Sequence, residues 1–308
     1  MSIFVPPTQT FILAVHEYWA MFVRADRLLS EEPDWFSKHV LGFHWEGFIP
    51  HLEYFDLEDR ELKELDLQHL ELIVSDTCRC VGSFSDDGYV PCPKHVKLTG
   101  GFAQCPTCAE VWIPVQECIF EPRCNGELCQ DKDARFCRKA HVVYAAFHGD
   151  LVKVGMTGGT RLRERAIEQG ADAIVPLVQV QGRKNARSLE KEITRRLRAK
   201  QGITGQDFSK ALLVRQSKGR LEDRYRTLLR SLEGEYPVMN ADLQLLSDYP
   251  MRVTLDEPPV RVDTVGPHQG KVLGIKGRFL IYEDDRGEVK MLELADLPSR
   301  LVETGQKG

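Results

Sequence analysis

The 308-residue sequence lacks long apolar runs. No stretch reaches the roughly 18 consecutive apolar residues that a membrane-spanning helix needs. The amino-terminal segment, with Pro6, Pro7, His16 and Glu17, does not have the basic leader of a signal peptide. Internal repeats and low-complexity tracts are also missing. These absences predict a globular cytoplasmic protein without a membrane partner.

An overall excess of basic charge is missing as well, since 41 basic and 46 acidic residues give a net charge of −5. The distribution is uneven, however. Residues 151–230 hold 19 Lys and Arg against 8 Asp and Glu, which leaves 22 basic and 38 acidic residues elsewhere. A net +11 segment in an acidic chain predicts a surface that faces DNA or RNA. A solvated, arginine-rich helix face is the alternative.

Cysteine is absent outside Cys78–Cys137, and all nine cysteines lie within that range. The cytosol keeps thiols reduced, so clustered cysteines there indicate a metal rather than disulfides. Zinc takes four thiolate or imidazole ligands. The candidate ligands are Cys78, Cys80, Cys92, His95, Cys105, Cys108, Cys118, Cys124, Cys129 and Cys137.

These ten candidates suffice for about two structural Zn²⁺ sites. Cys105 and Cys108 form a C-x-x-C knuckle, which presents two ligands from one turn. One site would use the last four cysteines, Cys118 to Cys137. The other would draw on the first six candidates, not all of which can be ligands. Free buried cysteines and an iron–sulfur cluster are the alternatives.

The pattern along the chain predicts an α+β fold in four parts. Residues 1–75 form a mixed lead-in region, and 76–140 a zinc-ribbon-like, Cys-rich module. Residues 141–235 form a ββαβα domain with one additional helix, and 240–308 a small β domain. In the third part we expect strands at 141–147 and 151–156 in a hairpin, a helix at 161–169, a strand at 173–180, a helix at 186–200 capped by Asn185, and a helix at 221–232.

Several motifs in the basic part resemble a known fold. Val142-Val143-Tyr144, then Val152-Lys153-Val154-Gly155, an arginine on the next helix and Leu189-Glu190 together resemble the GIY-YIG nucleases. A wider stretch, which includes the run 165–171 and Gly274-Ile275-Lys276-Gly277, is similar to an uncharacterised prokaryotic family of Cys-rich proteins with a GIY-YIG-like domain.

The resemblance implies a set of catalytic roles. In GIY-YIG enzymes a glutamate holds a divalent metal, an arginine stabilises developing charge and a tyrosine orients the attacking water. Tyr144 matches the tyrosine, and Glu190 matches the ligand for Mg²⁺ or Mn²⁺. Arg163 and Arg165 both fit the arginine. On the helix, Glu190 lies about 55° from the centre of the apolar stripe and Glu192 about 105°, so Glu190 should face the sheet. A carboxylate that simply pairs with a neighbouring arginine is the alternative.

The sequence also departs from this pattern. Val142 replaces the first glycine and Lys153 the second tyrosine. An ordinary lysine is protonated at neutral pH and is no base. The motifs therefore leave open whether the protein is an enzyme that cleaves a phosphodiester or a catalytically inactive zinc-stapled module that binds nucleic acid or protein. They do not indicate an oligomeric state.

Basic residues next to these motifs could follow a phosphate backbone. The Gly158-Gly159 loop precedes the first of them, and the remainder begin the helix that carries Glu190. The candidate nucleic-acid contacts are Arg161, Arg183, Lys184, Arg187 and Lys191.

Overall fold

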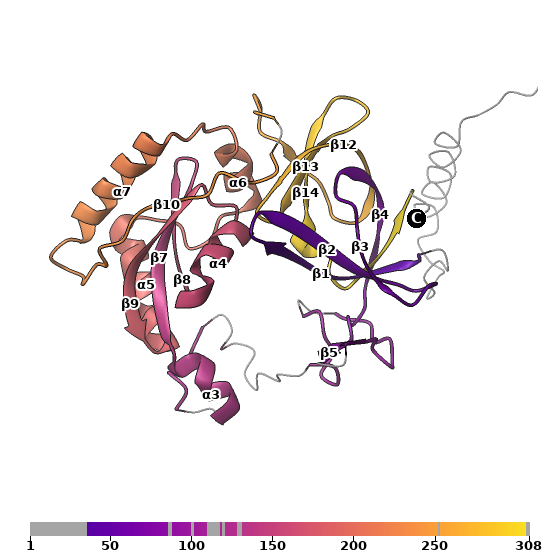
Figure 1. The fold of residues 1–308 in the computed structure, drawn as a ribbon, viewed down its shortest axis with the longest axis horizontal. Coiled ribbons are helices and arrows are strands. Elements are labelled where there is room, and N and C mark those ends of the chain that lie inside the picture. Colours follow the sequence, from indigo (N-terminus) through magenta and orange to yellow (C-terminus); the bar gives the residue numbers. More distant parts are fainter. Residues whose placement is uncertain are drawn as a thin grey trace, which may run out of the picture.

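The computed structural model describes residues 36–85, 88–99, 102–109, 118, 121–127, 131–251 and 253–305. The two larger β-sheets lie side by side, and the described parts of the Cys-rich segment lie along one edge of the molecule (Figure 1). The large sheet has nine strands in the order β11-β14-β13-β12-β4-β15-β1-β2-β3. The small sheet has four, in the order β10-β9-β7-β8. The mixed α+β character predicted from the sequence is confirmed.

The large sheet is built from both ends of the described chain. Its strands are β1 (Lys38–Glu46), β2 (Ile49–Asp56), β3 (Leu62–Glu64), β4 (His69–Cys78), β11 (Val260–Arg261), β12 (Gly266–Lys276), β13 (Phe279–Glu283), β14 (Val289–Glu293) and β15 (Arg300–Thr304). Strand β4 pairs antiparallel with both β12 and β15, and β1 pairs with β15. Sequence reasoning assigned 1–75 and 240–308 to separate parts, and the strands that the structure describes in these two parts share one sheet and one core.

The small sheet follows the predicted order of elements. Strands β7 (Ala140–His148) and β8 (Leu151–Gly158) form the expected hairpin, and β9 (Ala173–Gln181) pairs on the other side of β7. The short strand β10 (Gln244–Leu245) completes the edge. The central strand β7 is buried on both faces: Val143, Ala145 and Phe147 face one core and Val142, Tyr144 and Ala146 another.

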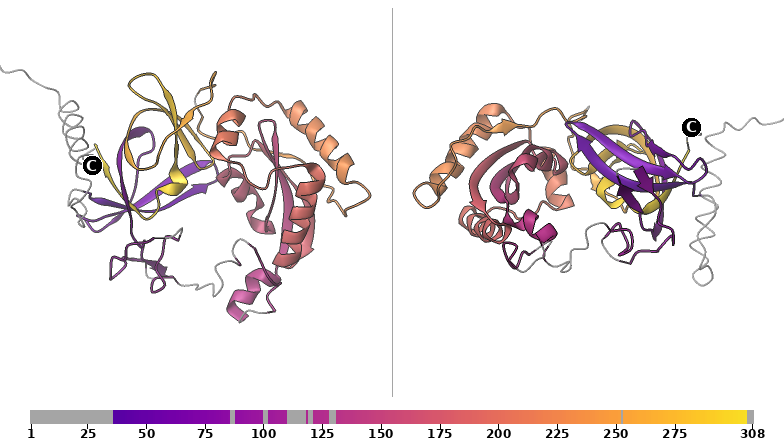
Figure 2. Two further views of the ribbon diagram at one scale, coloured as in Figure 1. Left: turned by 180° about the vertical axis from the view of Figure 1, so that it is seen from behind. Right: turned by 60° about the horizontal axis from the view of Figure 1, so that its bottom comes forward.

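Helices cover both faces of the small sheet. Helix α4 (Leu162–Glu168) packs between the two sheets, whereas α5 (Arg183–Leu197) and α7 (Lys218–Leu232) lie on the opposite face (Figures 1 and 2). The predicted cap at Asn185 is wrong, because α5 starts earlier and Gly182 is its N-cap. Among the described residues, no helix has the length and apolarity needed to cross a membrane.

Helix α6 (Gly205–Ala211) was not predicted from the sequence. Thr204 starts it with a capping box, in which its hydroxyl accepts from the Asp207 N–H and the Asp207 carboxylate accepts from the Thr204 N–H. The helix places Phe208 against Phe279 of the large sheet, with ring centroids 4.7 Å apart. A capped helix of seven residues is too short for apolar periodicity to reveal it.

The junction between the two sheets is tightly packed. The Trp45 indole donates a hydrogen bond to the Gly277 carbonyl at 2.8 Å, and the Tyr249 hydroxyl donates to the Ala171 carbonyl at 3.0 Å. A Cβ on Gly277 would lie 2.6 Å from the backbone nitrogen of Gly170. Two motifs quoted for the family resemblance, 165–171 and 274–277, therefore meet here.

The Cys-rich segment leaves the large sheet at the end of β4. Its first half carries a small ribbon, β5 (Ser83–Ser85) and β6 (Gly88–Val90), and Val81 packs on Leu41 and Phe55 of the large sheet. Its second half ends in α3 (Asp131–Arg138), which leads directly into β7.

Candidate metal centre and charged cleft

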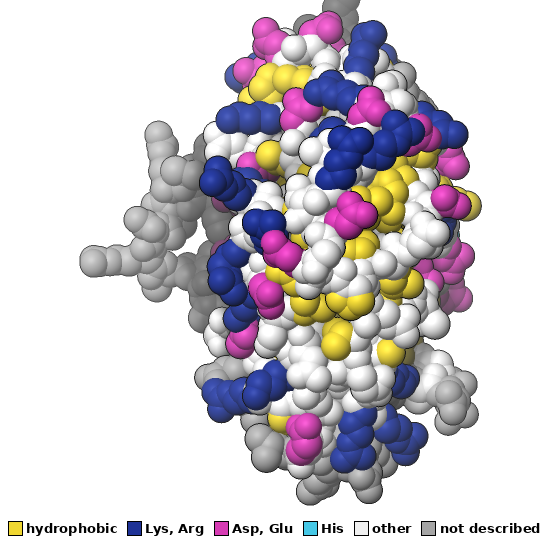
Figure 3. Space-filling view, turned by 90° about the vertical axis from the view of Figure 1, so that its left-hand side faces the viewer, with side chains coloured by type: hydrophobic (Ala, Val, Ile, Leu, Met, Phe, Trp, Pro, Cys, Tyr) yellow, Lys and Arg dark blue, Asp and Glu magenta, His cyan; other side chains and the backbone are white. Residues whose placement is uncertain are grey.

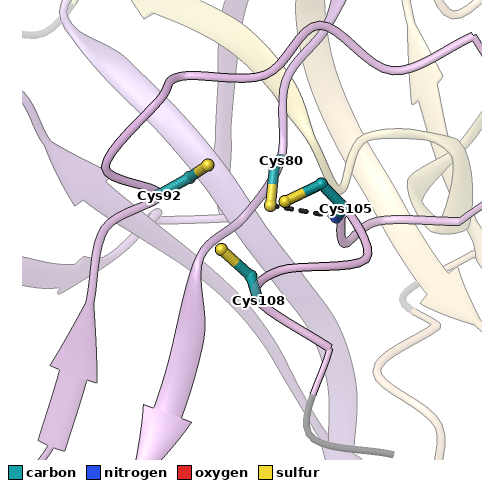
Figure 4. A group of neighbouring side chains, drawn as sticks. All are labelled: Cys80, Cys92, Cys105 and Cys108. Atoms are coloured by element: carbon teal, nitrogen blue, oxygen red, sulfur yellow. Dashed lines mark hydrogen bonds between the residues drawn. The ribbon is translucent and has the colours of Figure 1, made fainter. Parts of the chain in front are cut away.

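Four cysteines of the first half come together beside the ribbon. Cys80, Cys92, Cys105 and Cys108 are all buried, and their sulfur atoms all lie within 4.8 Å of one another. Figure 4 shows the four side chains pointing toward a common centre from three separate turns. We call this group the Cys cluster.

The backbone at each turn orients the sulfur atoms. The N–H of Cys108 donates to the Cys105 carbonyl at 3.0 Å, which closes the predicted knuckle. The N–H groups of Gly82 and Cys105 donate to the Cys80 sulfur at 3.4 and 3.2 Å. Gly82 has φ +80°, and a Cβ there would lie 2.3 Å from the Val90 carbonyl oxygen, so this turn requires glycine. Backbone donors to sulfur favour the thiolate form.

The donor set fits a tetrahedral metal ion. Four sulfurs bound at about 2.3 Å to one ion would lie about 3.8 Å apart, inside the separation found. Burial raises the pKa of the Cys105 thiol, but hydrogen bonds from the Cys108 N–H and the Cys80 thiol outweigh it and bring the pKa to about 7. Burial and the neighbouring thiols raise the pKa of Cys108. The pKa of Cys105 is thus lowered while that of Cys108 is raised. A bound cation would favour the deprotonated form of both, because it stabilises all of the thiolates together.

The remaining candidate ligands fall outside the Cys cluster. Cys78 is the last residue of β4, and His95 is exposed. For the expected second site, Cys118, Cys124 and Cys137 do not form a metal-ligand group in the described part of the chain. Cys129 lies outside the described residues.

A cleft opens where α4, β8 and the large sheet meet. Its volume is about 350 Å³. We call it the sheet cleft. Its walls are partly aromatic and partly charged, with charged side chains from α4, β8 and the turn before β13. The lining residues are Phe43, Trp45, Lys153, Arg165, Glu168, Gln169, Gly202, Ile203, Phe208, Arg278, Phe279 and Ala295.

Lys153 projects from β8 into this cleft. Its ammonium nitrogen donates to the Gln169 side-chain oxygen at 2.7 Å. Burial is the main cause that lowers the pKa of Lys153. The positive charges of Arg165 and Arg278 also lower it and Glu190 acts in the opposite direction, and the resulting pKa is about 8. An ordinary lysine is almost fully protonated at neutral pH, but a part of Lys153 is neutral there and can act as a base.

Tyr144 lies on the central strand β7, close to Lys153 of the neighbouring strand β8. Its side chain is only 1% exposed, and its hydroxyl donates to the same Gln169 oxygen at 3.3 Å. Burial raises the pKa of Tyr144, so it stays protonated at neutral pH. Gly155 makes room for the ring, because a Cβ at that position would lie 2.6 Å from the Tyr144 hydroxyl.

The two candidate arginines of α4 point in different directions. Arg165 lines the sheet cleft and pairs with Glu168 at 2.8 Å. Arg163 instead places its guanidinium over the Phe48 ring, 5.5 Å from the centroid. Arg161 is largely exposed and pairs with Glu168 at 3.0 Å. The structure thus brings Arg165, and not Arg163, to Lys153.

Glu190 is buried at the inner face of α5, at 4% exposure, and Glu192 is exposed, so the predicted orientation of the helix is confirmed. The Glu190 carboxylate accepts a hydrogen bond from Arg187 at 2.8 Å. Its charge also acts on Tyr144 and Lys153. The carboxylate is therefore both paired with a neighbouring arginine and close to the Tyr144–Lys153 pair.

The basic residues at the start of α5 mostly contact the Cys-rich segment. Arg187 and Lys191 both pair with Glu121, at 3.2 and 2.6 Å. Arg183 donates to the Cys118 carbonyl at 2.6 Å and stacks on Phe136, 5.1 Å from the ring centroid. Lys184 is exposed. Much of the predicted nucleic-acid face of α5 thus contacts described residues in the second half of the Cys-rich segment.

The surface beyond the cleft does not carry one uniform charge. On the side that lies at the left of Figure 1, Lys and Arg alternate with Asp and Glu around an apolar band (Figure 3). Ion pairs such as Arg196–Glu235 and Arg226–Asp223 account for part of this mixing. The excess positive charge of residues 151–230 is therefore distributed rather than collected on this face.

Gln169 and Arg278 are polar cleft residues that received no role from the sequence. Gln169, which bridges Tyr144 and Lys153, lies within the quoted run 165–171, so a signal existed without an assigned role. Arg278 follows Gly277 directly and comes from the distant large sheet. Nothing in the local pattern connects it with Lys153.

The fold and these sites define an α+β protein with a buried four-cysteine cluster and a separate charged cleft between two sheets. Residues 67–294 match the family described as protein of unknown function (DUF2797). The match covers well over half of the chain, and the chain belongs to this family. No curated protein and no solved structure matches the chain.

Proposed function

We propose that this protein binds nucleic acid, with the sheet cleft as the contact for phosphate and a structural Zn²⁺ at the Cys cluster. The observation that supports this most strongly is the meeting of Lys153, Arg165 and Arg278 in one cleft. These cations come from β8, α4 and the loop before β13. Lysine and arginine are the usual phosphate ligands of proteins.

The order of elements around the cleft supports a GIY-YIG-like interpretation of residues 140–197. The strands β7 and β8, helix α4, strand β9 and helix α5 follow the ββαβα order that the resemblance implies. The charge of Glu190 acts on the titration of both Tyr144 and Lys153. A shared fold does not by itself fix a function, so the proposal rests on the residues of the cleft.

Zinc is the metal that we propose for the Cys cluster. Four thiolates without an open position suit a structural zinc ion. The cluster would stabilise a segment with few apolar residues, since Val96 and Leu98 are the apolar side chains of the described residues that pack against it. Thiols that bind metal must stay reduced, which agrees with the proposed cytoplasmic location.

Hydrolysis of a phosphodiester is the second candidate function. It is favoured by the position of the buried Glu190 near Tyr144 and Lys153. Glu190 would hold Mg²⁺ or Mn²⁺, Arg165 would bind the developing charge, and Lys153 would replace the second tyrosine of the motif. The Arg187–Glu190 pair opposes it, because the carboxylate would have to leave Arg187 to bind a metal. The non-catalytic module remains the simpler form of the proposal.

Binding and cleavage can be tested together on labelled single- and double-stranded DNA and RNA, with and without Mg²⁺ or Mn²⁺. We expect binding that weakens as salt rises, and an affinity about tenfold lower for Arg165→Gln, since each phosphate contact contributes to the salt slope. Lys218→Gln, on the exposed face of α7, is the matched control and should bind normally.

Each outcome has a clear reading. Cleavage that Glu190→Ala abolishes would support the hydrolytic candidate. Salt-dependent binding without cleavage would support the module. If neither DNA nor RNA binds at low salt, nucleic acid is not the partner.

A further inference from the structure

The ammonium group of Lys153 has an unusual setting. Among the residues that the structure describes, no carboxylate lies within ion-pair distance of its nitrogen, and its hydrogen bond goes to the neutral Gln169 side chain. The nearby guanidiniums of Arg165 and Arg278 add positive charge to the same cleft. Buried lysines usually have a paired anion, and this one has cations beside it.

Several neighbouring elements contribute charged or titratable groups near Lys153. Helix α4 supplies Arg165 and Glu168, β13 begins beside Arg278, and α5 supplies Glu190. His148 of β7 is neutral at neutral pH, because burial lowers its pKa to about 3. Burial first, and then the two arginines, outweigh Glu190 and bring the pKa of Lys153 to about 8.

An amine in such a setting differs chemically from a surface lysine. About a tenth of it is neutral at pH 7, against less than a thousandth of an ordinary lysine. Desolvation and a neighbouring cation are the two devices by which proteins activate a lysine for attack on carbonyl carbon. The Gln169 oxygen fixes the nitrogen at the cleft surface.

We propose that Lys153 is the nucleophile of a site for aldehydes that carry a phosphate group, with which it forms a Schiff base in the sheet cleft. The neutral nitrogen adds to the aldehyde carbon, and a proton passes from that nitrogen to the carbonyl oxygen to give a carbinolamine. The hydroxyl then takes a second proton from solvent and leaves as water, while the nitrogen lone pair forms the C=N bond of the protonated imine on Lys153. The reaction exchanges no electrons with another reagent and is reversible.

The two arginines supply the recognition of phosphate. Arg165 and Arg278 reach the cleft from different elements, so they can contact a dianion from two sides. Glu168 takes Nη1 of Arg165 and Glu293 takes Nε of Arg278, while a guanidinium has five N–H donors. The cleft volume of about 350 Å³ lies at the small end of ligand pockets, which suits a short sugar phosphate.

Two sources offer this chemistry. One is a free sugar phosphate. The other is the ring-opened sugar of an abasic site in DNA, an aldehyde flanked by phosphates, which would deepen the proposed nucleic-acid function. The first source does not depend on nucleic-acid binding at all.

The test traps the imine in the full-length protein. Glyceraldehyde 3-phosphate is added with sodium cyanoborohydride, which delivers hydride to the imine and leaves a stable secondary amine, and peptide mass mapping locates the adduct. We expect Lys153 to react at least about tenfold faster than Lys200, whose ammonium group pairs with Asp207. The rate at Lys153 should rise through pH 8, not through pH 10.

Variants and a second probe complete the experiment. Lys153→Arg, which keeps the charge but cannot form an imine, should lose the fast adduct, and Lys200→Arg should keep it. Glyceraldehyde without phosphate should react about tenfold more slowly in the wild type, and this preference should shrink in Arg165→Gln. An abasic oligonucleotide trapped with borohydride reports the DNA source.

The outcomes separate the hypotheses. Trapping of the triose phosphate without the oligonucleotide supports the site and assigns it to free sugar phosphates. Trapping of both assigns it to abasic DNA as well. Adducts spread evenly over surface lysines, or undiminished in Lys153→Arg, would overturn the proposal, whatever the result of the nucleic-acid binding assay.

Discussion

Gly155 shows how one residue on β8 decides where a side chain of β7 can lie. Replacing it with alanine puts a methyl group 2.6 Å from the Tyr144 hydroxyl, inside a core where that ring is 1% exposed. We expect Gly155→Ala to lower the free energy of unfolding by about 1–3 kcal/mol, the usual effect of overpacking. Thermal unfolding would measure this. Gly158→Ala, with no atom within 4 Å of the added Cβ, is the control and should unfold like the wild type.

Because of Lys153, the free energy of unfolding should change with pH in the alkaline range. The pKa of Lys153 is about 8 in the folded state and about 10.4 when unfolded, so between these values the unfolded chain binds more protons. Stability from this group therefore rises with pH across that window. We expect Lys153→Met to be more stable than the wild type at pH 7 and to lose that advantage toward pH 10. Denaturant unfolding at both pH values would show it, and an equal difference at the two would contradict it.

The residue patterns predicted which way helix side chains point better than which residues they contact. The helical stripe placed Glu190 inward and Glu192 outward, because a single helix fixes that angle. The same pattern could not show that Arg187 pairs with Glu190, or that Arg165 rather than Arg163 reaches the cleft. Those facts depend on which neighbouring element covers each face of the helix.

Among the elements, the Cys cluster gives the clearest test of assignment. Cys105→Ser should remove the metal ion, from about one per cluster to nearly none, because it takes away one of four ligands. It should also lower the melting temperature of the full chain. Elemental analysis of the purified protein measures the metal content.

Cys78→Ser is the matched control for this experiment. Cys78 lies two residues from Cys80 but at the end of β4, outside the Cys cluster. The Cys78→Ser protein should retain the metal of the cluster. Loss of metal in Cys78→Ser and retention in Cys105→Ser would show that the ligand set is wrong.

Spacing in the sequence found only one of the two pairs in this cluster. Cys105 and Cys108 stand at knuckle spacing, whereas Cys80 and Cys92 are twelve positions apart and meet through the β5–β6 ribbon. A local signal did exist at Cys80-Val81-Gly82, where a glycine with φ +80° turns its N–H toward sulfur. At helix α5 the local signal was misleading, since Asn185 is a residue type typical of N-caps but lies inside the first turn.

At the scale of the whole molecule, the region matched by the family is smaller than the unit that folds. Residues 67–294 include β4 and β12 but omit β1–β3 and β15. Those strands cover one side of β4 and supply Phe43 and Trp45 to the sheet cleft. We expect a fragment of residues 67–294 to aggregate or to unfold without cooperativity, because an unpaired edge of β4 invites association. Circular dichroism and size-exclusion chromatography would show this, and a sharp unfolding transition in a monomeric fragment would refute it.

Long-range pairing is also the part of the fold that the sequence did not disclose. Strand patterns indicated β-structure both before the cysteines and after residue 240, but a period of two residues carries no record of the partner strand. The antiparallel pairing of β1 with β15 joins positions more than 250 residues apart, as at Lys38 and Val302. The Lys276–Asp172 ion pair, which ties the two sheets together, was likewise invisible.

This arrangement has a consequence for synthesis on the ribosome. The chain emerges from its amino end, so β1–β4 appear long before β12 and β15 exist to flank β4. The Cys cluster and the four strands of the small sheet lie between them in sequence and are therefore translated before β12 and β15. The last strands to be translated then pair with the first ones. The sheet cleft, which needs both Lys153 and Arg278, therefore forms only at that final step.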